Sequence, residues 1–288
     1  MLLSVIMLLS VVRVNSSAVK VNITENELKY FVSVKDLRCE AHPTVKLFLN
    51  NKYISERAYL INDTTYIPLR ATAEIAGATV KYDARTRSAT VSMKGLVMQV
   101  SDGSYVIEAN GRAIVSKSPA VILADGRMYV PVRSIAKALS LGVSWSSDRT
   151  VSLKGEVKPI ARAEEFYDAD TLYWLSRIIS AESRGEPLLG QIAVGEVVLN
   201  RVKSKDFPST VWGVIFDRKH GVQFSPVENG SIYKEPSYNS VIAAKLCLEG
   251  FSLDKNVLFF MEPSKSTSSW IPTNRKYAFT VANHYFFY

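Results

Sequence analysis

Residues 63–95, DTTYIPLRATAEIAGATVKYDARTRSATVSMKG, recur in altered form at residues 125–155 as DGRMYVPVRSIAKALSLGVSWSSDRTVSLKG. A Tyr-x-Pro-x-Arg motif marks both copies at an offset of 63 residues, with Tyr66, Pro68 and Arg70 corresponding to Tyr129, Pro131 and Arg133. Self-similarity at a fixed spacing is the sequence signature of a repeated structural unit. The first half of the chain is therefore expected to contain two copies of one small fold.

Each copy carries strand signals on both sides of a short helix. Residues that favour strands, with Asn and Asp-Gly turns, precede the motif, and alanine and aliphatic residues follow it. Proline suits the first turn of a helix, where N–H groups lack intrahelical acceptors. We therefore expect an α+β protein whose N-terminal part is a β-rich tandem of two ββαββ-like repeats. The motif arginines either pack structurally or bind a ligand.

The length of 288 residues, 47% of them apolar, allows two ordinary domains with separate cores. We expect a signal peptide at residues 1–18, the repeat domain at 19–155, a linker at 156–169 and a second domain at 170–288. The run MLLSVIMLLSVV at residues 1–12 is too short to span a bilayer and resembles the apolar core of a secretory signal. Because no basic segment precedes it, cleavage and retention as an anchor both remain open, and a buried strand is the alternative.

The positive charge lies in the first half of the chain. Residues 1–155 hold 20 Lys and Arg against 12 Asp and Glu, whereas residues 156–288 hold 15 of each kind. In an exported protein this imbalance favours binding to an anionic wall polymer over binding to nucleic acid, for which no basic run or motif is present. A generally basic, solvated surface explains the charge equally well.

Cysteine and histidine give no pattern typical of a metal site. Cys39 and Cys247 lie far apart, and His42, His220 and His284 show no zinc-ligand spacing. We expect buried thiols, no metal and no cofactor. The sequence leaves the oligomeric state open.

A helix is expected after the polar linker, with Asp168 or Asp170 as its N-cap. Apolar residues at intervals of three and four, Leu172, Leu175 and Ile179, define its inward face, and the next step of three reaches Glu182. Gly185 and Pro187 end the helix. Burial and the negative end of the helix dipole both disfavour ionisation, so Glu182 is expected to retain a proton near neutral pH, as a general acid must. Ion pairing with Arg184 or Arg201 is the structural alternative.

Several separated motifs surround this glutamate. AESRGEP is followed by GQIAVGEVVLNRV, FPSTVWGVIF, GVQFSPVENGSIY, LCLEG, VLFFMEPSKSTSSWI and a terminal HYFF. In this order, over about residues 172–288, they resemble the SleB/CwlJ family of cell wall hydrolases, known for degrading spore cortex during germination. Residues 44–155 similarly resemble the copper amine oxidase N-terminal-like domain, which occurs in exported bacterial proteins as a wall-associated module and implies no copper chemistry here.

The resemblance implies a lysozyme-like, mainly helical α+β domain with Glu182 as the catalytic acid. It implies a secreted, wall- or cortex-associated enzyme acting on peptidoglycan glycan strands, either as a lytic transglycosylase or as a muramidase or glucosaminidase. A non-catalytic wall-binding protein is the alternative from a different class. The candidate substrate-binding residues are Glu186, Asn200, Gln223, Phe224, Tyr233 and Trp270.

Some of these candidates have structural alternatives. Glu186 either caps the next helix or faces substrate, Asn200 either approaches the catalytic helix or serves only the fold, and each aromatic residue is equally suited to core packing. Glu196 is a second acid or a neutral substitution. The sequence departs from the family pattern at Glu262, where Asn usually precedes Pro, and at Ser183, where alanine is common.

Overall fold

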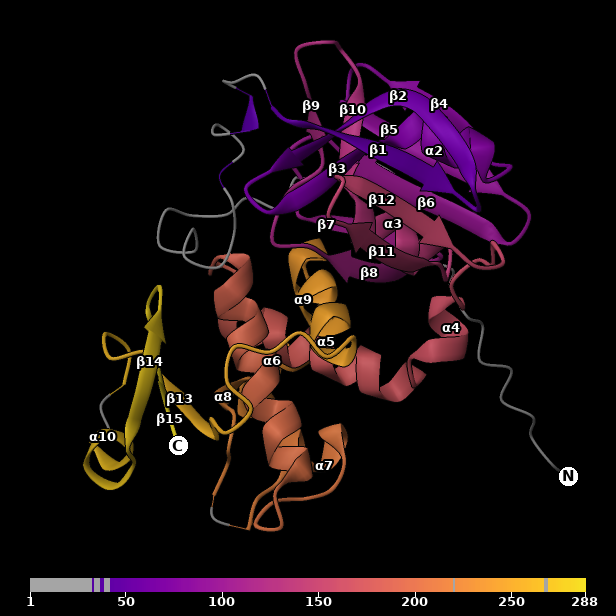
Figure 1. The fold of residues 1–288 in the computed structure, drawn as a ribbon. Coiled ribbons are helices and arrows are strands. Elements are labelled where there is room, and N and C mark those ends of the chain that lie inside the picture. Colours follow the sequence, from indigo (N-terminus) through magenta and orange to yellow (C-terminus); the bar gives the residue numbers. More distant parts are fainter. Residues whose placement is uncertain (1–32, 34–36, 39–41, 220, 267–268) are drawn as a thin grey trace, which may run out of the picture.

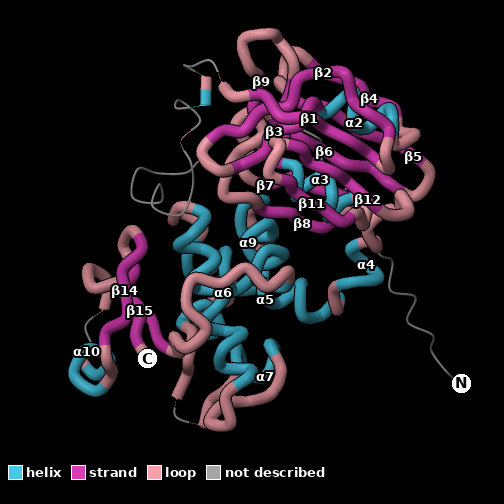
Figure 2. Tube along the Cα trace, in the orientation of Figure 1, coloured by secondary structure: helices cyan, strands magenta, loops and turns pink. Residues whose placement is uncertain are grey.

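The computed structural model describes residues 33, 37, 38, 42–219, 221–266 and 269–288. The expected signal peptide at residues 1–18 lies outside the described residues. The remainder forms a strand-rich N-terminal half, residues 42–155, and a mainly helical C-terminal half, residues 156–288, which lie against each other (Figures 1 and 2). The expected α+β class is therefore confirmed. Among the described residues, no helix combines the length and apolar character needed to cross a membrane.

The N-terminal half contains two sheets and two short helices. The seven-stranded sheet has the order β11 (Gly142–Ser146), β12 (Thr150–Lys154), β1 (Thr44–Leu49), β2 (Lys52–Ile61), β3 (Thr64–Pro68), β10 (Met128–Pro131) and β9 (Val121–Ile122). The five-stranded sheet has the order β4 (Thr79–Asp83), β5 (Ser88–Met93), β6 (Leu96–Ser101), β7 (Val106–Ala109) and β8 (Arg112–Val115). The helices, α2 (Leu69–Ile75) and α3 (Val132–Ala138), each begin directly after the proline of a Pro-x-Arg motif and include its arginine.

The two repeats exchange their closing hairpins. Hairpin β4–β5 of the first repeat pairs through β5 with β6 of the second repeat, and hairpin β11–β12 of the second repeat pairs through β12 with β1 of the first. Residues from both repeats, including Leu47, Val91 and Leu153, share one hydrophobic core. Each repeat has the expected helix and closing hairpin, but among the described residues three strands precede α2 and five precede α3, where two were expected. The two copies form one intertwined body rather than two neighbouring modules.

The Tyr-x-Pro-x-Arg motifs meet at the centre of this body. Strands β3 and β10 run antiparallel, with Tyr66 opposite Pro131 and Pro68 opposite Tyr129, so the two copies are related by a local twofold arrangement. Both tyrosines are fully buried, and each hydroxyl is satisfied: Tyr66 donates to the Pro119 carbonyl at 3.0 Å and Tyr129 to Asp125 at 2.8 Å. The prolines stand at the N-caps of α2 and α3, as expected.

The C-terminal half is built around three packed helices, α5 (Ala169–Ser183), α6 (Leu188–Lys203) and α9 (Tyr238–Leu248). A Cβ atom on Gly195 of α6 would lie 2.6 Å from Ile179 Cδ1 and 3.0 Å from Cys247 Sγ, so glycine permits the close approach of all three. The shorter helices are α4 (Ala163–Phe166), α7 (Val211–Phe216), α8 (Ser225–Glu228), η2 (Ser231–Tyr233) and α10 (Trp270–Asn274).

A three-stranded sheet completes the C-terminal half, with the order β13 (Phe259–Met261), β15 (His284–Phe287) and β14 (Tyr277–Val281). Successive strand residues point to opposite faces. Phe260 and Phe286 share the inner face and pack with Val194 and Val197 of α6, whereas Phe259 and Phe287 lie on the outer face. The two faces of this sheet therefore carry different residues.

The two halves are joined through the side chain of Glu249, at the C-cap of α9. Arg112 of β8 donates two hydrogen bonds to its carboxylate, at 2.7 and 2.8 Å, and Lys137 of α3 and Tyr167 donate at 2.9 and 2.7 Å. The Arg112 guanidinium also lies 3.3 Å from the ring centroid of Phe166. Burial raises the pKa of Glu249, but these donors outweigh that effect and hold the pKa below its usual value.

We predict that Glu249→Gln lowers the free energy of unfolding by about 3 kcal/mol at pH 7, because the buried Arg112 guanidinium loses the charge that compensates its burial. Chemical denaturation measures the difference. Since the folded-state pKa of Glu249 is lowered, the stabilisation is present above the unfolded-state pKa and is lost as pH falls through the folded-state value. The difference between the two proteins should therefore disappear in strong acid.

The matched control is Glu164→Gln, at an exposed position on α4 whose ion pair with Arg162 is 3.6 Å long and open to solvent. It should unfold like the parent protein. Equal stability of Glu249→Gln and the control at pH 7 would show that the Glu249 cluster does not hold the halves together.

Candidate active site

Glu182 is the second-last residue of α5. The Asp168 side chain caps the start of this helix by accepting a hydrogen bond from the Thr171 N–H at 2.8 Å, as the sequence suggested. The helix ends at Ser183 with Arg184 as C-cap, slightly before the expected end at Gly185. Leu175 and Ile179 are fully buried on the face that continues to Glu182. The predicted position of an acid at the end of an inward-facing stripe is thus correct.

The Glu182 side chain is partly buried and unpaired. Within the described residues, no hydrogen bond or ion pair engages its carboxyl group. Burial raises the pKa of Glu182 to about 7, and the nearby positive charge of Lys265 opposes this only in part. Arg184 is exposed, and Arg201 instead donates to the Leu258 carbonyl at 2.7 Å, so the alternative of a structural ion pair is wrong. A carboxyl group of this kind is protonated in a substantial fraction of molecules at neutral pH.

Lys265 lies within electrostatic range of three acidic residues at this end of the domain. Its ammonium group pairs with Glu262 at 2.7 Å, and the charges of Glu186 and Glu182 further raise its pKa. Ser264 also donates to Glu262, at 2.9 Å. The hydrogen bonds from Lys265 hold the pKa of Glu262 below its usual value. Glu262 is therefore an anion paired with the lysine whose charge acts on Glu182.

Glu186 anchors the C-terminal sheet to the segment after α5. The backbone and side-chain amides of Asn283 donate to its carboxylate at 3.2 and 3.0 Å, and His284 Nδ1 lies 3.9 Å away. Pro187, not Glu186, occupies the N-cap of α6, and no acidic residue lies in the first turn of that helix. The helix-capping interpretation of Glu186 is therefore wrong.

The loop before α9 contributes residues of very different exposure. Phe224 is only 2% exposed and packs against Phe260, with ring centroids 6.3 Å apart, which favours its core-packing alternative. Gln223 is partly exposed, and its side chain donates to the Gly221 carbonyl at 3.2 Å. Tyr233 is 61% exposed and lies edge-on to Trp174 of α5, at 6.3 Å. Of these three, Tyr233 presents the most surface to a ligand.

Tyr233 belongs to a strip of aromatic rings beside α5. Trp174 also contacts Phe216 at 5.1 Å, and Phe216 stacks on Trp212 at the same centroid distance. Trp212 is 56% exposed. Trp212 lies in the FPSTVWGVIF motif, where no sequence pattern distinguishes a ligand-binding aromatic residue from one in the core. Exposed aromatic faces of this kind suit the apolar faces of sugar rings.

Two candidates serve the fold away from Glu182. Asn200 is buried and donates to the carbonyls of Asp254 and Val257, at 3.1 and 3.0 Å. Glu196 is buried and accepts hydrogen bonds from the Ser252 hydroxyl and from the backbone N–H groups of Leu253 and Asp254. Both side chains fix the chain that follows α9, so the alternative of a fold role is correct for Asn200, and Glu196 is a structural acceptor.

Trp270 lies on the outer face of the C-terminal sheet. It packs edge-on to Phe259 at 6.2 Å, and the Arg275 guanidinium lies 5.1 Å from its ring centroid. Phe260 and His284, in contrast, occupy the inner face of the same sheet. The structure therefore does not bring Trp270 onto the face that carries His284 and adjoins Glu186.

Sequence reasoning missed Lys265 and His284. His284 is 3% exposed, its Nδ1 has no hydrogen-bond partner among the described residues, and burial lowers its pKa despite the nearby charge of Glu186. Both residues fall in motifs already quoted, MEPSK and HYFF. Their positions relative to Glu182 depend on long-range strand pairing, which no local pattern indicates.

Comparison with known families agrees with this division of the chain. Residues 185–288 match the family described as Cell Wall Hydrolase, and residues 48–153 match the Copper amine oxidase N-terminal domain. The C-terminal region is a cell wall hydrolase domain. A copper amine oxidase N-terminal-like domain precedes it. The hydrolase match begins three residues after Glu182, so the assignment of that residue rests on its geometry.

The related curated proteins are spore cortex-lytic enzymes. Identity is 39% over 107 residues with the protein of Bacillus cereus, covering 37% of this chain and 40% of the relative. It is 35% over 115 residues with that of Oceanobacillus iheyensis, covering 40% and 41%, and 36% over 97 residues with that of Bacillus subtilis, covering 34% and 31%. The chain therefore spans less than half the length of each of these relatives.

Two solved structures are also similar to part of this chain. The catalytic domain of the germination-specific lytic transglycosylase SleB from Bacillus anthracis is 37% identical, with a TM-score of 0.39, covering 42% of this chain and 97% of that one. The catalytic domain of the Bacillus cereus SleB protein is 35% identical, with a TM-score of 0.38, covering 42% and 92%.

We predict that the Glu182 carboxyl titrates with a midpoint near pH 7, because its burial penalises the charged form. Carbon-13 NMR of the glutamate carboxyl groups, assigned with Glu182→Gln, measures this midpoint. Lys265→Met should raise it further, since the variant removes the positive charge that stabilises the carboxylate. A midpoint at the ordinary glutamate value of 4.5 would contradict the burial argument.

We also predict that Glu182→Gln is more stable than the parent protein above pH 7. The folded-state pKa is raised, so the parent loses stability as pH rises from the unfolded-state value of 4.5 to about 7. Allowing for partial solvent exposure, the gain is about 2 kcal/mol at pH 8 and disappears below pH 4. Denaturant unfolding at both pH values tests this, and a variant less stable than the parent at pH 8 would contradict it.

Proposed function

We propose that this protein is a peptidoglycan-degrading glycosidase that acts as a lytic transglycosylase, with Glu182 as its acid and base. The observation that carries the proposal is the unpaired, partly buried carboxyl of Glu182, whose pKa is raised to about 7. The cell wall hydrolase domain and the relatives named as spore cortex-lytic enzymes supply the substrate class. The proposed bond is the glycosidic link from N-acetylmuramic acid to N-acetylglucosamine.

The reaction uses one carboxyl group in two steps. Protonated Glu182 donates its proton to the leaving glycosidic oxygen as the bond to the anomeric carbon breaks. The resulting carboxylate then removes the proton from the 6-hydroxyl of the same muramic acid residue, and this oxygen attacks the anomeric carbon. The product is a 1,6-anhydro sugar end, and Glu182 regains its proton.

The nearby carboxylates favour this one-carboxylate reaction. Two-carboxylate glycosidases use a second acidic side chain as nucleophile or base. Here Glu186 accepts hydrogen bonds from Asn283, and Glu262 is engaged by Lys265 and Ser264. Direct hydrolysis to a reducing end, as by a muramidase or glucosaminidase, would use the same Glu182 with water as the attacking group.

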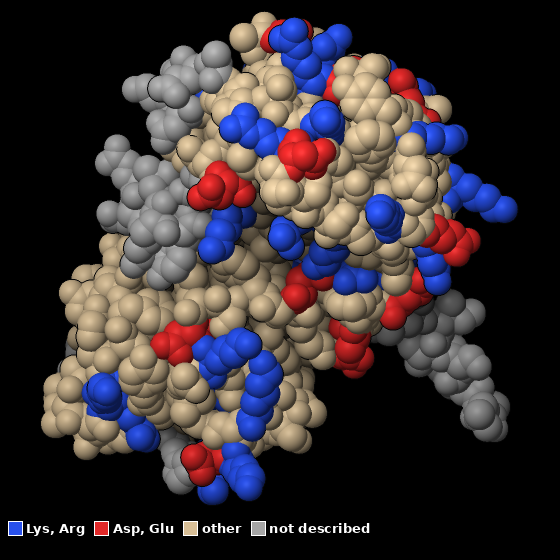
Figure 3. Space-filling model, in the orientation of Figure 1, with Lys and Arg blue, Asp and Glu red and all other residues tan. Residues whose placement is uncertain are grey.

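The proposed setting is outside the cytoplasm, at the cell wall or spore cortex, where the substrate lies. The excess of Lys and Arg in the N-terminal half supports attraction to anionic wall polymers. Figure 3 shows basic side chains over much of the N-terminal half on the face drawn, interspersed with acidic ones. The basic charge therefore supports a general electrostatic contribution to wall binding.

We predict that Glu182→Gln lowers the release of soluble muropeptides from purified cortex or vegetative sacculi by at least about 100-fold, because the amide cannot donate the proton. Mass spectrometry identifies the product, and 1,6-anhydro ends are expected. The rate for the parent protein should fall as pH rises through about 7, since the acid form of Glu182 is lost there.

Glu164→Gln is the control, because it makes the same chemical change at an exposed position on α4. It should release products at the parental rate. Undiminished release by Glu182→Gln would overturn the assignment of Glu182. Products with reducing ends only would replace transglycosylation with hydrolysis, and binding to sacculi without any cleavage would favour a non-catalytic wall protein.

A further inference from the structure

Two pockets in the N-terminal half occupy equivalent places in the two repeats. The α2 pocket has a volume of about 280 Å³ and the α3 pocket about 720 Å³. The motif positions correspond: Pro68, Arg70 and Tyr82 line the first, and Pro131, Arg133 and Trp145 line the second. Each pocket is completed by a hairpin of the other repeat, residues 126–128 for the α2 pocket and 63–65 for the α3 pocket. The duplication therefore produced a pair of comparable cavities.

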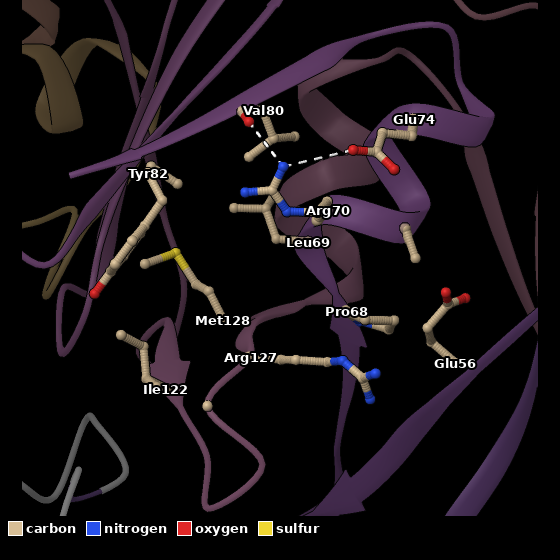
Figure 4. Close-up of a pocket in the computed structure, with 13 residues that line it drawn as sticks. Glu56, Pro68, Leu69, Arg70, Glu74, Val80, Tyr82, Ile122, Arg127 and Met128 are labelled. Carbon is tan, nitrogen blue, oxygen red and sulfur yellow. Dashed lines mark hydrogen bonds and ion pairs between the residues drawn. The ribbon is translucent and has the colours of Figure 1, made fainter. Parts of the chain in front are cut away.

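The charges of the α2 pocket are satisfied within the protein. Arg70 donates to the Val80 carbonyl at 2.9 Å and pairs with Glu74 at 3.6 Å, as Figure 4 shows. Glu56 also lines this pocket, on the side where Arg127 lies. Two arginines thus face two glutamates, so the pocket has no excess of positive charge.

The α3 pocket differs from the α2 pocket at the position of the glutamate that pairs with the motif arginine. The residue equivalent to Glu74 is Lys137, which turns to Glu249 in the C-terminal half at 2.9 Å. Arg133 therefore has no acidic neighbour on its own helix. Within the described residues, neither Arg133 nor Lys117 makes a hydrogen bond or ion pair, and Asp63 is the acidic residue among those lining the pocket. Apart from Lys137, which Glu249 balances, the lining holds two cations and one carboxylate, an excess of one positive charge.

An exposed tryptophan stands beside these cations. Trp145 of β11 is 48% exposed and lines the α3 pocket with the apolar side chains of Val143 and Val151. An indole face stacks on the apolar face of a pyranose ring, while guanidinium and ammonium groups bind carboxylate or phosphate oxygens. The cavity volume falls in the range of about 300–1,000 Å³ typical of small-ligand sites.

We propose that the α3 pocket binds an acidic saccharide unit of a cell wall polymer, with the sugar ring on Trp145 and the anionic group on Arg133 and Lys117. The choice of a wall polymer rests on the proposed function, whereas the choice of an acidic sugar rests on the pocket. The α2 pocket, whose arginine is already paired, does not bind this ligand with comparable affinity.

The α3 pocket lies near the hydrolase domain, so binding there would keep the substrate polymer close to the catalytic residue. Lys137 lines the pocket and also binds Glu249 at the C-cap of α9, so the site lies directly at the junction of the two halves (Figure 1). A polymer held there remains attached to the protein between cleavage events. Its local concentration at the hydrolase domain rises without any change at Glu182.

The test measures binding of the full chain to purified sacculi by co-sedimentation, in the Glu182→Gln background so that cleavage plays no part. Trp145→Ala and Arg133→Ala should each weaken binding at least about tenfold, the loss of one stacking or charged contact. The matched variants at the equivalent positions, Tyr82→Ala and Arg70→Ala, should bind within about twofold of the parent. Arg133→Lys should retain part of the affinity, because it keeps the charge.

Two further measurements identify the anionic group that is bound and check that weakened binding does not result from misfolding of a variant. Binding is compared between sacculi that retain their phosphate-bearing polymers and sacculi from which these have been removed. Loss of binding on removal indicates a phosphate ligand, and unchanged binding indicates peptidoglycan carboxylates. Circular dichroism confirms that each variant is folded, and the Arg133→Ala protein should show a shallower dependence of affinity on salt. Parental binding by folded Trp145→Ala and Arg133→Ala, or equal losses in all four alanine variants, would overturn the proposal.

These results are independent of the proposed activity. If Glu182→Gln in an otherwise parental chain still cleaves glycan, the catalytic assignment fails. The ratio of binding between α3-pocket and α2-pocket variants still tests the pocket, because all of them share the same residual cleavage. If Glu182→Gln cleaves nothing and the four pocket variants bind alike, the pocket proposal fails while the catalytic assignment stands.

Discussion

The buried carboxylate of Glu249 is shared by Arg112, Lys137 and Tyr167, which come from both halves of the chain. Removing such a charge from water is costly unless several donors replace the water, and here four hydrogen bonds do so. This requirement fixes α9 against β8 and α3. Lys137 also lines the α3 pocket, and its ion pair with Glu249 balances its charge there. The junction and the pocket therefore share one residue, Lys137.

The features predicted correctly from the sequence are those governed by neighbouring residues. The spacing of Leu175, Ile179 and Glu182 defines one helical face, and Asp168 caps the helix because its side chain reaches the N–H three residues later. The exchange of hairpins between the repeats was not predictable in this way. The pattern of β5 identifies a strand with one buried face, but it does not determine whether β3 or β6 lies beside it.

The same limit applies to the candidate site. Asn200 and Glu196 were considered as site residues because they lie in a motif, yet their partners are carbonyls and amides more than 50 residues further along the chain. Lys265 and His284 approach Glu182 and Glu186 through the C-terminal sheet, whose strands are separated by a long connection. Phe224 is buried and Tyr233 is exposed although both lie in the segment before α9. This difference depends on packing against distant residues, such as Phe260 against Phe224. A local pattern contains no information on such coverage.

The exchanged hairpins also limit how the N-terminal domain can evolve. Hairpin β4–β5 completes one sheet and hairpin β11–β12 the other, so deletion of either copy would leave unpaired edges in both sheets. A tandem duplication without exchange gives a spare copy that is free to be lost. With the exchange, each repeat supplies a hairpin that the other repeat needs to complete a sheet. The residues that line the two pockets can still change independently. The two repeats must therefore be retained together for this domain to fold. The pockets have diverged nonetheless, since Arg70 is paired with Glu74 whereas Arg133 has no ion pair among the described residues.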